Sequence, residues 1–465
     1  MKINKNQLIW GLIGVILIIF LFTVKDKITN YSLNTDENSY FYMGKAISEG
    51  RFPYGDFFFA HPPVHAYISG IVFKIFGFNF TALKLVPVIA VLISAFFIFR
   101  IVGEKFDKTK AILAVILFLF QYNLLRVSTQ SAGINLTVMF LVISTYYLFK
   151  EKYILSGVFA GFAGITGLYS LVFPVVIGLY LLFSKNKKDI FRFGLGFCLI
   201  FVLVNLFFLI SYKADYFESV YEFHLKKPKS ELSPFYRFSI LSVAFQLNIF
   251  LFLSAITIFF TKHWKKLKHL IFVSTGFILF LVALPRAFLF YYVLIFPFLA
   301  ILGSIGFTEV IKKKPLQKYR KVLIGLFMII IILFSVTKFN RDYVEYDQTM
   351  IQEMADYIEV NSAEDDLIFG DYYVVPLLAL IADRDLAFDM ADTNYMRFKS
   401  GITNINDTIK ELKQEERLKF VVIEPKRDLA YLEDFVAGFL KTNCELLKIF
   451  KADNFGEYYV FDCKI

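Results

Sequence analysis

Long apolar stretches recur along the first 337 residues, and they constrain the fold of this chain more than any other feature. A helix needs about 20 mostly apolar residues to cross the hydrocarbon core of a bilayer. The chain is 57% hydrophobic and contains 58 Phe, well above the apolar content of a soluble domain. We therefore predict an all-α polytopic membrane bundle. Its candidate spans, about eleven by this criterion, are residues 8–24, 81–101, 111–126, 132–149, 153–169, 170–183, 193–212, 237–261, 270–284, 287–310 and 322–337.

Two apolar stretches need a separate interpretation. The run from Leu8 to Val24 is similar to the core of a signal peptide, but no small-residue cleavage site follows it and further spans come after it. We expect it to be the first membrane helix. The stretch 64–78 is short and contains Lys74, which favours an interfacial or re-entrant helix over a full span.

The basic residues lie between alternate spans. Five loops together hold 19 Lys/Arg: residues 102–110, 150–152, 184–192, 262–269 and 311–321. The loops of the opposite set are short and nearly uncharged, except for two long ones at about 25–80 and 213–236. Because Lys/Arg-rich short loops stay in the cytoplasm, we expect a cytoplasmic N-terminus. An odd number of spans then places the C-terminal part outside.

Residues 338–465 differ in character from the rest of the chain. They carry 15 Lys/Arg and 26 Asp/Glu, a net charge of −11, which leaves +21 for residues 1–337. Helical patterns such as Tyr346 to Val360 alternate with the apolar runs LIFG (367–370) and KFVVIE (419–424). We predict a transmembrane domain over 1–337 and a small extracytoplasmic α/β domain over 338–465. The latter shows no catalytic constellation, so we interpret it as an acceptor-binding or scaffold module, or as a cap on the membrane cavity.

The three cysteines exclude a disulfide framework and the paired spacing of a zinc or redox motif. Cys198 lies in an apolar stretch. Cys444 and Cys463 bracket the hairpin-like stretch FKADNFGEYYVF, so a single bridge between them is open if that side of the membrane is oxidising.

The first long outer loop contains the densest group of ionisable and aromatic residues. Asp36 and Glu37 are adjacent, just after the first span, and Tyr40, Tyr54, Asp56, His61 and His65 follow. A carboxylate that is partly desolvated at the membrane surface is a candidate general base for a hydroxyl acceptor. The alternative is that Asp36 and Glu37 only cap a helix that continues to Ser48.

Isolated cations occur at the predicted outer ends of spans, although Lys and Arg are usually enriched in cytoplasmic loops. Examples are Arg126, Arg286 and the group Lys226, Lys227, Lys229 and Arg237. A single Arg at a helix end most often extends toward lipid headgroups. If these cations gather on the face that carries Asp36, they would suit the phosphate of a lipid-linked substrate.

Several short motifs resemble those of the GT-C glycosyltransferases. The Asp36–Glu37 pair is followed by an aromatic-rich helix, by GRFPYGD (50–56) and by His61-Pro62-Pro63. Two later stretches agree with this pattern: EFHLKKPKSE (222–231), which contains His224, and PRAFLFYYVLIFPFLA (285–300), which contains Tyr291 and Tyr292. The closer resemblance is to the family 39 branch, with its protein O-mannosyltransferases and the lipid A aminoarabinose transferase. The latter has Lys where this chain has His61, which we expect to be neutral at pH 7.

The resemblance implies a GT-C type fold with a polyprenyl- or dolichyl-phosphate sugar as donor. Asp36 would deprotonate an acceptor hydroxyl that attacks the anomeric carbon with inversion, and Glu37 would hold the acceptor or raise the pKa of Asp36. The predicted ligands of the donor phosphate are Arg126, Arg286, Lys226, Lys227 and His61. The predicted sugar- or acceptor-binding residues are Tyr40, Tyr54, Asp56, His65, His224, Tyr291 and Tyr292. An aromatic belt at the membrane interface also explains such tyrosines.

The expected partners are a lipid-linked sugar, a protein, glycolipid or polysaccharide acceptor, and membrane lipids, with no nucleic acid. The scheme requires no cofactor, although Asp36, Glu37 and Asp56 could hold a divalent cation, as in the GT-C oligosaccharyltransferases. Two other functions stay open. One is transport of a lipid-linked or anionic solute, which usually requires ionisable or broken sites near mid-membrane. The other is a non-catalytic role in envelope assembly, against which the intact Asp36–Glu37 pair argues.

Overall fold

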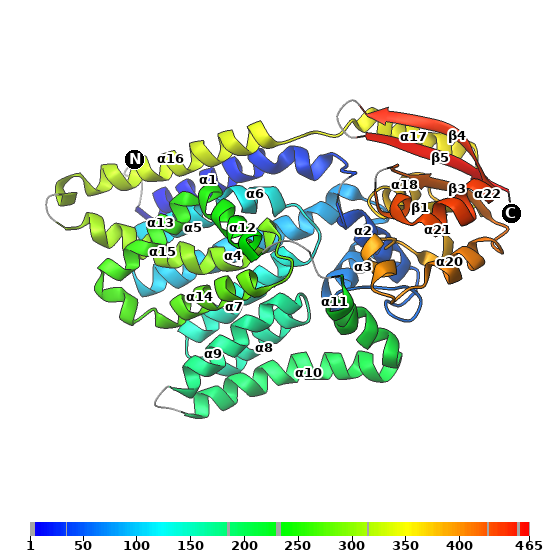
Figure 1. Cartoon of the computed structure of the whole chain (residues 1–465). Helices are drawn as coiled ribbons and strands as arrows, with labels where there is room; N and C mark the ends of the chain where they lie inside the picture. The colour runs from blue at the N-terminus through cyan, green and yellow to red at the C-terminus, as the bar shows by residue number, and fades with distance from the viewer. Residues whose placement is uncertain are drawn as a thin grey trace. The chain divides into compact units, whose positions relative to one another are not determined.

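A computed structural model describes residues 5–33, 35–183, 187–228, 234–313, 316–425, 427–452 and 456–464. Most of these residues are helical, and one five-stranded sheet lies in the last quarter of the chain (Figure 1). The α-helices are α1 (Lys5–Thr29), α2 (Glu37–Ser48), α3 (Val64–Phe76), α4 (Phe80–Lys105), α5 (Lys108–Leu119), α6 (Tyr122–Val127), α7 (Ile134–Phe149), α8 (Tyr153–Gly164), α9 (Val172–Leu182), α10 (Lys187–Phe217), α11 (Phe223–Lys226), α12 (Pro234–Leu247), α13 (Ile249–Ile256), α14 (Lys268–Ala283), α15 (Phe296–Ile311), α16 (Arg320–Asp342), α17 (Gln348–Val360), α18 (Val375–Ile381), α19 (Tyr395–Lys399), α20 (Ile405–Leu412), α21 (Glu433–Phe435) and α22 (Lys441–Asn443).

Contacts divide the chain into two compact units. We call the first the membrane unit; it consists of Met1–Ile28, Lys84–Asn205 and Lys229–Tyr343. We call the second the loop–sheet unit; it consists of Thr29–Leu83, Leu206–Pro228 and Val344–Ile465. The second unit therefore joins the two long loops, which were predicted to lie outside, to the C-terminal part. The predicted domain division at residue 337 stays a prediction.

The helices of the chain include several that can cross a bilayer. Among the described residues, five are long and apolar enough: Gln7–Thr29, Phe80–Lys105, Lys187–Lys226, Leu289–Ile311 and Leu316–Asp342. The helices Phe235–Leu247 and Ile249–Phe260 pass the same test together, with a bend of 90° between them. Five more apolar helices are shorter: Val64–Phe76, Ile134–Phe149, Tyr153–Gly164, Leu168–Leu182 and Lys268–Ala283. The count of eleven spans stays a prediction.

Two of the predicted spans are broken in the structure. The stretch 111–126 forms α5, which ends at Leu119, and the separate short helix α6, because Gln121 between them has an extended backbone. The stretch 237–261 breaks at Asn248, whose side-chain amide donates to the Ala244 carbonyl at 2.8 Å and whose side-chain oxygen accepts the Asn123 N–H. A side-chain amide that binds backbone groups in this way competes with the regular helical hydrogen bonds, which explains the break at Asn248.

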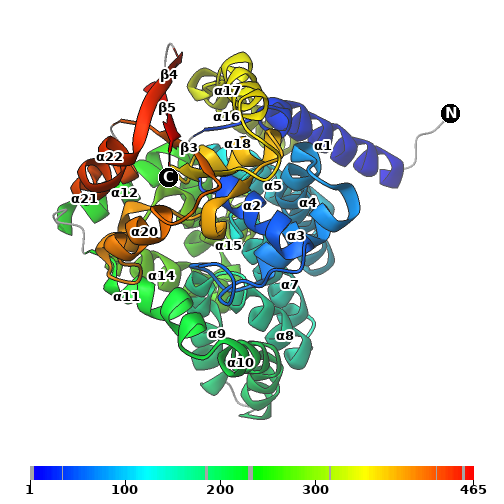
Figure 2. The same ribbon diagram turned by 90° about the vertical axis from the view of Figure 1, so that its right-hand side faces the viewer.

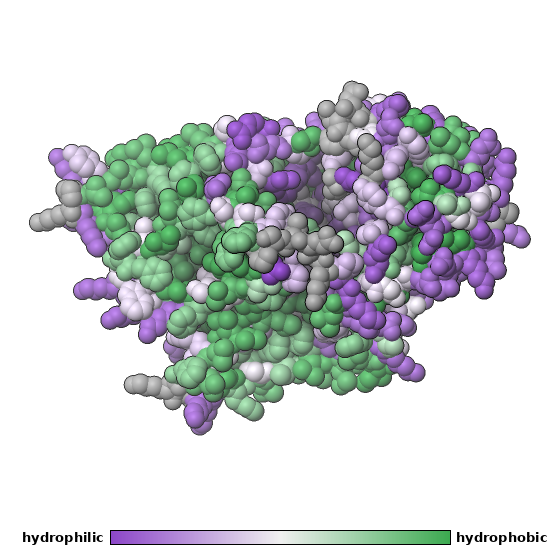
Figure 3. All heavy atoms as spheres, in the orientation of Figure 1, coloured by the Kyte–Doolittle hydropathy of each residue, from purple (hydrophilic) through white to green (hydrophobic). Residues whose placement is uncertain are grey.

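Large apolar side chains remain exposed on the membrane unit. In α10 they include Phe191, Leu195 and Leu199, and similar residues line α1 and α16. Figure 3 shows hydrophobic residues over most of the visible surface of these helices. Soluble proteins rarely expose apolar patches of this size, whereas the acyl chains of a bilayer cover them in membrane proteins. The protein is therefore a multi-pass membrane protein.

Small residues let α8 approach α10 closely. A Cβ atom added at Gly157 would lie 2.0 Å from the Phe193 carbonyl oxygen, and one added at Gly196 would lie 2.1 Å from that of Ile154. Such distances exclude any side chain. The Gly-rich stretch 157–167 therefore serves tight packing between membrane helices.

The sheet of the loop–sheet unit has the strand order β2-β1-β3-β5-β4. The strands are β1 (Leu367–Gly370), β2 (Asp385–Leu386), β3 (Leu418–Ile423), β4 (Cys444–Ala452) and β5 (Gly456–Cys463). β1 is parallel to β2 and β3, whereas β5 is antiparallel to β3 and β4. The predictions of strands at 367–370 and 419–424, and of a helix that ends at Val360, are confirmed.

The hairpin of β4 and β5 is closed by a disulfide. Cys444 and Cys463 face one another in the ladder, and their sulphur atoms are bonded. The bridge that the sequence left open is thus present in the structure.

α2 is the element that connects the first outer loop to the C-terminal part. It lies between α3 and α18 in both views (Figures 1 and 2). Its contact with α3 depends on a glycine, because a Cβ at Gly44 would lie 2.8 Å from the Cβ of Ser69. Close packing on both sides holds the start of α2 in a defined place.

Candidate active site

Asp36 immediately precedes α2, but its carboxylate does not cap the helix. The residue has helical backbone angles and makes no side-chain capping bond. The hydroxyl of Thr35 instead accepts the Glu37 N–H, at 3.4 Å. The interpretation of Asp36 as a helix cap is therefore wrong, and its carboxylate is available for other interactions.

The Asp36 side chain is surrounded by residues of the C-terminal part. The Tyr372 hydroxyl hydrogen-bonds its carboxylate, and Asp392 and Asp428 add like charge nearby. Lys227 acts on it with the opposite charge. Burial, and then the charges of Asp392 and Asp428, raise the pKa of Asp36 to about 6, against the lowering effects of Lys227 and Tyr372. A carboxylate with a pKa near 6 is a stronger base than an ordinary Asp and is still ionised at pH 7.

The loops that supply these partners follow the carboxyl ends of parallel strands. Asp371 directly follows β1, and its carboxylate accepts the N–H groups of Glu424, after β3, and of Leu429. The side chain is 2% exposed, and burial raises its pKa well above the ordinary value. Because parallel strands end at the same edge of a sheet, this edge is where α/β folds place ligand-binding loops.

His61 is held by contacts with three residues. The Tyr40 hydroxyl lies 2.8 Å from its Nε2, and the Tyr54 hydroxyl donates to its carbonyl at 2.7 Å. The Nε2 of His224 lies 2.7 Å from the carbonyl oxygen of the preceding residue, Ala60. Burial and the neighbouring His65 lower the pKa of His61 well below its ordinary value. The side chain is therefore neutral at pH 7 and can offer a hydrogen bond but no charge.

His65 and Tyr54 lie inside an aromatic cluster. His65 is 3% exposed, and neither ring nitrogen has a hydrogen-bond partner within the described residues. Tyr54 is 4% exposed, and its ring packs against Phe59 and Tyr216. This burial favours a structural role for Tyr54, and the predicted role of both residues in sugar binding stays a prediction.

The two adjacent lysines after α11 have different surroundings. Lys226 is half-exposed and pairs with Glu222 at 2.7 Å. The Nζ of Lys227 lies 4.3 Å from the centroid of the Phe223 ring, and its charge acts on both Asp36 and His61. Of the two, Lys227 is the better candidate for a phosphate ligand. The end of this segment, residues 229–231, lies outside the described residues.

The other predicted site residues of the outer loop are Glu37 and Asp56. Glu37 is 2% exposed, at the first position of α2. Asp56 is exposed and accepts the Phe52 N–H at 2.6 Å, so it stabilises a turn. Among the described residues, no group of three or more His, Cys, Asp or Glu has the geometry of a metal site. The possible role of Asp36, Glu37 and Asp56 in holding a divalent cation stays a prediction.

The remaining candidates belong to the membrane unit. Arg126 is exposed, with its guanidinium 5.9 Å from the Tyr122 ring centroid. Tyr291 donates to the Tyr169 hydroxyl at 3.0 Å. Tyr292 is fully buried, and its hydroxyl lacks a partner within the described residues. The predicted ligand roles of Arg126, Arg286, Tyr291 and Tyr292 stay predictions.

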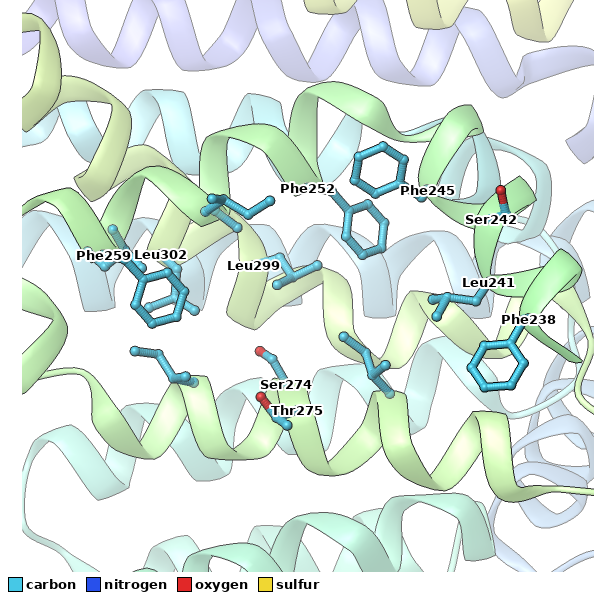
Figure 4. A pocket seen from close by; sticks show the side chains of 15 residues that line it. Phe238, Leu241, Ser242, Phe245, Phe252, Phe259, Ser274, Thr275, Leu299 and Leu302 are labelled. Atoms are coloured by element: carbon cyan, nitrogen blue, oxygen red, sulfur yellow. The ribbon is translucent and has the colours of Figure 1, made fainter.

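The membrane unit also contains an apolar cavity of about 500 Å³ between α12, α13, α14 and α15. Figure 4 shows its aromatic and aliphatic lining, with the hydroxyls of Ser242, Ser274 and Thr275 as the labelled polar groups. A cavity of this composition suits a hydrocarbon chain.

Tyr372, Asp392 and Asp428 were not among the residues singled out from the sequence. They lie more than 330 positions from Asp36 along the chain, and the sheet brings them to it. The available signal was local: GDYY directly follows the buried strand LIFG, at a strand end where polar residues often bind ligands.

The known proteins that are similar to this chain include mannosyltransferases and other glycosyltransferases. Residues 60–208 match the family described as dolichyl-phosphate-mannose-protein mannosyltransferase. The structure superposes on ArnT from Cupriavidus metallidurans bound to undecaprenyl phosphate with a TM-score of 0.73. That match has 12% sequence identity and covers 99% of this chain and 98% of ArnT. The chain therefore has the fold of the GT-C membrane glycosyltransferases.

Two further relatives of this GT-C protein agree. The oligosaccharyltransferase of Archaeoglobus fulgidus, tethered to an acceptor peptide, has a TM-score of 0.62 at 11% identity, over 97% of this chain and 74% of that one. GPI mannosyltransferase 1 of Kluyveromyces lactis is 22% identical over 141 residues. That segment is 29% of this chain and only 35% of the relative. The structural matches show a shared fold, and the resemblance drawn from the motifs is confirmed for the superfamily.

Proposed function

We propose that this GT-C protein is an inverting glycosyltransferase that moves a sugar from a polyprenyl- or dolichyl-phosphate donor to an acceptor hydroxyl on the outer face of the membrane. The observation that carries the proposal is Asp36, a partly buried carboxylate that does not cap α2 and has a pKa near 6. The positive charge of Lys227 acts on this carboxylate. A general base and a cation that can bind phosphate are what this transfer requires.

The step is a single displacement. The acceptor hydroxyl gives its proton to the Asp36 carboxylate while its oxygen forms a bond to the anomeric carbon. The bond between that carbon and the phosphate oxygen breaks, and its electron pair leaves with the lipid phosphate. The phosphate then gains negative charge, which Lys227 stabilises and to which His61 offers a neutral hydrogen bond. Asp36 finally releases its proton to water.

Two features of the units support the lipid donor and the outer face. The apolar cavity beside α12 and α14 has the composition needed for part of an isoprenoid chain. The bond between Cys444 and Cys463 fits an oxidising compartment, and such bonds are rare in the cytosol. The acceptor is a protein, a glycolipid or an envelope polysaccharide, reached by way of the loops that follow β1 and β3.

The test uses the full chain purified into lipid nanodiscs with a labelled polyprenyl-phosphate hexose and a membrane extract as the source of acceptor. We expect the native protein to release polyprenyl phosphate and Asp36→Asn to release it at least about a hundredfold more slowly. Asp407→Asn changes an exposed aspartate of α20 in the same way and should act as the native protein does. Release that is equal in all three proteins would refute Asp36 as the base, and no release from any such donor would refute the proposed reaction.

A further inference from the structure

The tyrosine pair that follows β1 contacts the start of α2 by backbone and side chain together. The Ser39 hydroxyl donates to the Tyr372 carbonyl at 2.8 Å, and the Asn38 side-chain amide donates to the Tyr373 carbonyl. The Tyr372 hydroxyl reaches Asp36 itself. Two hydrogen bonds to its backbone carbonyls thus join this short loop to the first turn of α2, directly after Asp36.

The rings of the two tyrosines pack together. Their centroids lie 3.9 Å apart, with an angle of 33° between the ring planes. The Tyr373 ring therefore limits the movement of the Tyr372 ring.

The loop is rigid because Asp371 holds it from the other side. The Asp371 N–H donates to the Val422 carbonyl at 3.0 Å, and its carboxylate accepts the backbone N–H groups of Glu424 and Leu429, in the segment that follows β3. Tyr372 itself is 5% exposed. The Tyr372 side chain, fixed in this way, can hold the Asp36 carboxylate in one orientation.

We propose that Tyr372 is a positioning residue for Asp36: its hydroxyl, delivered by the loop after β1, aims the carboxylate that takes the acceptor's proton. The C-terminal part thereby completes the active site and is more than a cap over it. The inference rests on the proposed function, because it assigns Tyr372 a role only if Asp36 is the base.

The charges around Asp36 set the expected effect on its protonation. Asp392 and Asp428 disfavour its ionised form, whereas Lys227, after α11, and the Tyr372 hydroxyl favour it. Loss of the hydroxyl therefore raises the pKa of Asp36, so that less of the base is ionised in mildly acidic solution. A residue with only a structural role would lower the rate by the same factor at every pH.

The experiment compares Tyr372→Phe with the native protein in the donor-release assay between pH 5 and 8.5. We expect the rate to be about tenfold lower, as for a lost hydrogen bond to a charged group. The acidic limb of the pH–rate profile, where the rate falls as Asp36 is protonated, should move to higher pH by about one unit. The KM for the donor should not change. The matched control is Tyr459→Phe, which removes another tyrosine hydroxyl that donates to a carboxylate, that of Glu457. The control should keep the native profile.

An unchanged acidic limb, or an equal loss of rate at every pH, would overturn the inference. If Tyr372→Phe fails to fold, 3,5-difluorotyrosine at position 372 keeps the ring and makes the hydroxyl a stronger donor, so the limb should move to lower pH. A limb that does not move would overturn the inference as well. Should Asp36→Asn keep full activity, the proposed function fails; should Asp36→Asn be inactive while Tyr372→Phe matches the native protein, only this inference fails.

Discussion

The two ends of α2 contact the C-terminal part through opposite kinds of electrostatics. At the C-terminal end, Lys45 pairs with Asp385 at 3.0 Å and Arg51 pairs with Asp389. At the N-terminal end, Asp36 faces the like charges of Asp392 and Asp428. Opposite charges therefore pair at the C-terminal end of α2, whereas like charges lie near one another at its N-terminal end.

This difference separates stability from reactivity along one helix. The ion pairs at the end of α2, reinforced by the Tyr42 hydroxyl at 3.2 Å from Asp385, hold the helix against the region of β2. The Leu386 N–H adds a bond to that hydroxyl at 2.8 Å. These contacts hold Asp36 in a place that its own charge disfavours. Crowded carboxylates of raised pKa are typical of sites that do chemistry.

The largest expected effect is a split between activity and stability in Asp36→Asn. The rate of polyprenyl phosphate release should fall at least about a hundredfold, because the general base is lost. A carboxyl group whose pKa rises on folding destabilises the fold when ionised; the cost begins above its unfolded pKa and is complete above about pH 6. At pH 8 the variant should therefore be up to about 3 kcal/mol more stable than the native protein.

Thermal unfolding of the two proteins in the same detergent, at pH 8 and at pH 4, measures this stability. The advantage of the variant should disappear at pH 4, where the native carboxyl is protonated. A variant that is less stable at pH 8 would show that Asp36 supports the fold and would remove the contrast between the two ends of α2.

Arg51→Ala tests the complementary end. It leaves the mostly buried Asp389 without its cation, which should destabilise the protein by about 1–3 kcal/mol. The control is Arg417→Ala, which breaks the exposed pair with Glu415 and should cost less than about 1 kcal/mol. Thermal unfolding again gives the measurement. Equal Tm values for both variants would mean that the ion pairs at the end of α2 add nothing to stability.

A smaller effect distinguishes the adjacent lysines near the reactive end. Lys227→Ala should lower donor turnover by about tenfold, since it removes the cation next to Asp36 and His61. Lys226→Ala breaks only an exposed pair with Glu222 and should change turnover by less than about twofold. Steady-state release of polyprenyl phosphate compares the two. A greater loss in Lys226→Ala would assign the phosphate to the other side of α11.

The sequence predicts well what depends on local pattern. The long apolar helices α1, α4 and α16 lie where the spans were expected, and the helix after Asp36 ends at Ser48 as predicted. The strands β1 and β3 and the hairpin of β4 and β5 follow from short apolar runs and turn residues. Breaks inside apolar stretches were missed, as at Asn248, because a single polar side chain decides them and hydropathy averages over it.

Only some residues of the candidate site could be predicted from the sequence. Asp36, His61 and Lys227 stand in loops whose residue types suggest chemistry. Tyr372 and Asp392 come to Asp36 because a parallel sheet folds their loops to one edge, and no local pattern records that long-range pairing. The expectation that Glu37 tunes Asp36 stays untested, whereas the neighbouring charges that the structure identifies come from the C-terminal part.

The most direct test of the central claim is the pH dependence of donor turnover by the native protein. The phosphodiester of a polyprenyl-phosphate sugar does not titrate between pH 5 and 8, so an acidic limb in that range reports a group of the protein. If Asp36 is the base, kcat/KM should fall below about pH 6 by about tenfold per pH unit. The small residual rate of Asp36→Asn should show no such limb. A flat profile for the native protein, or the same limb in Asp36→Asn, would contradict the account.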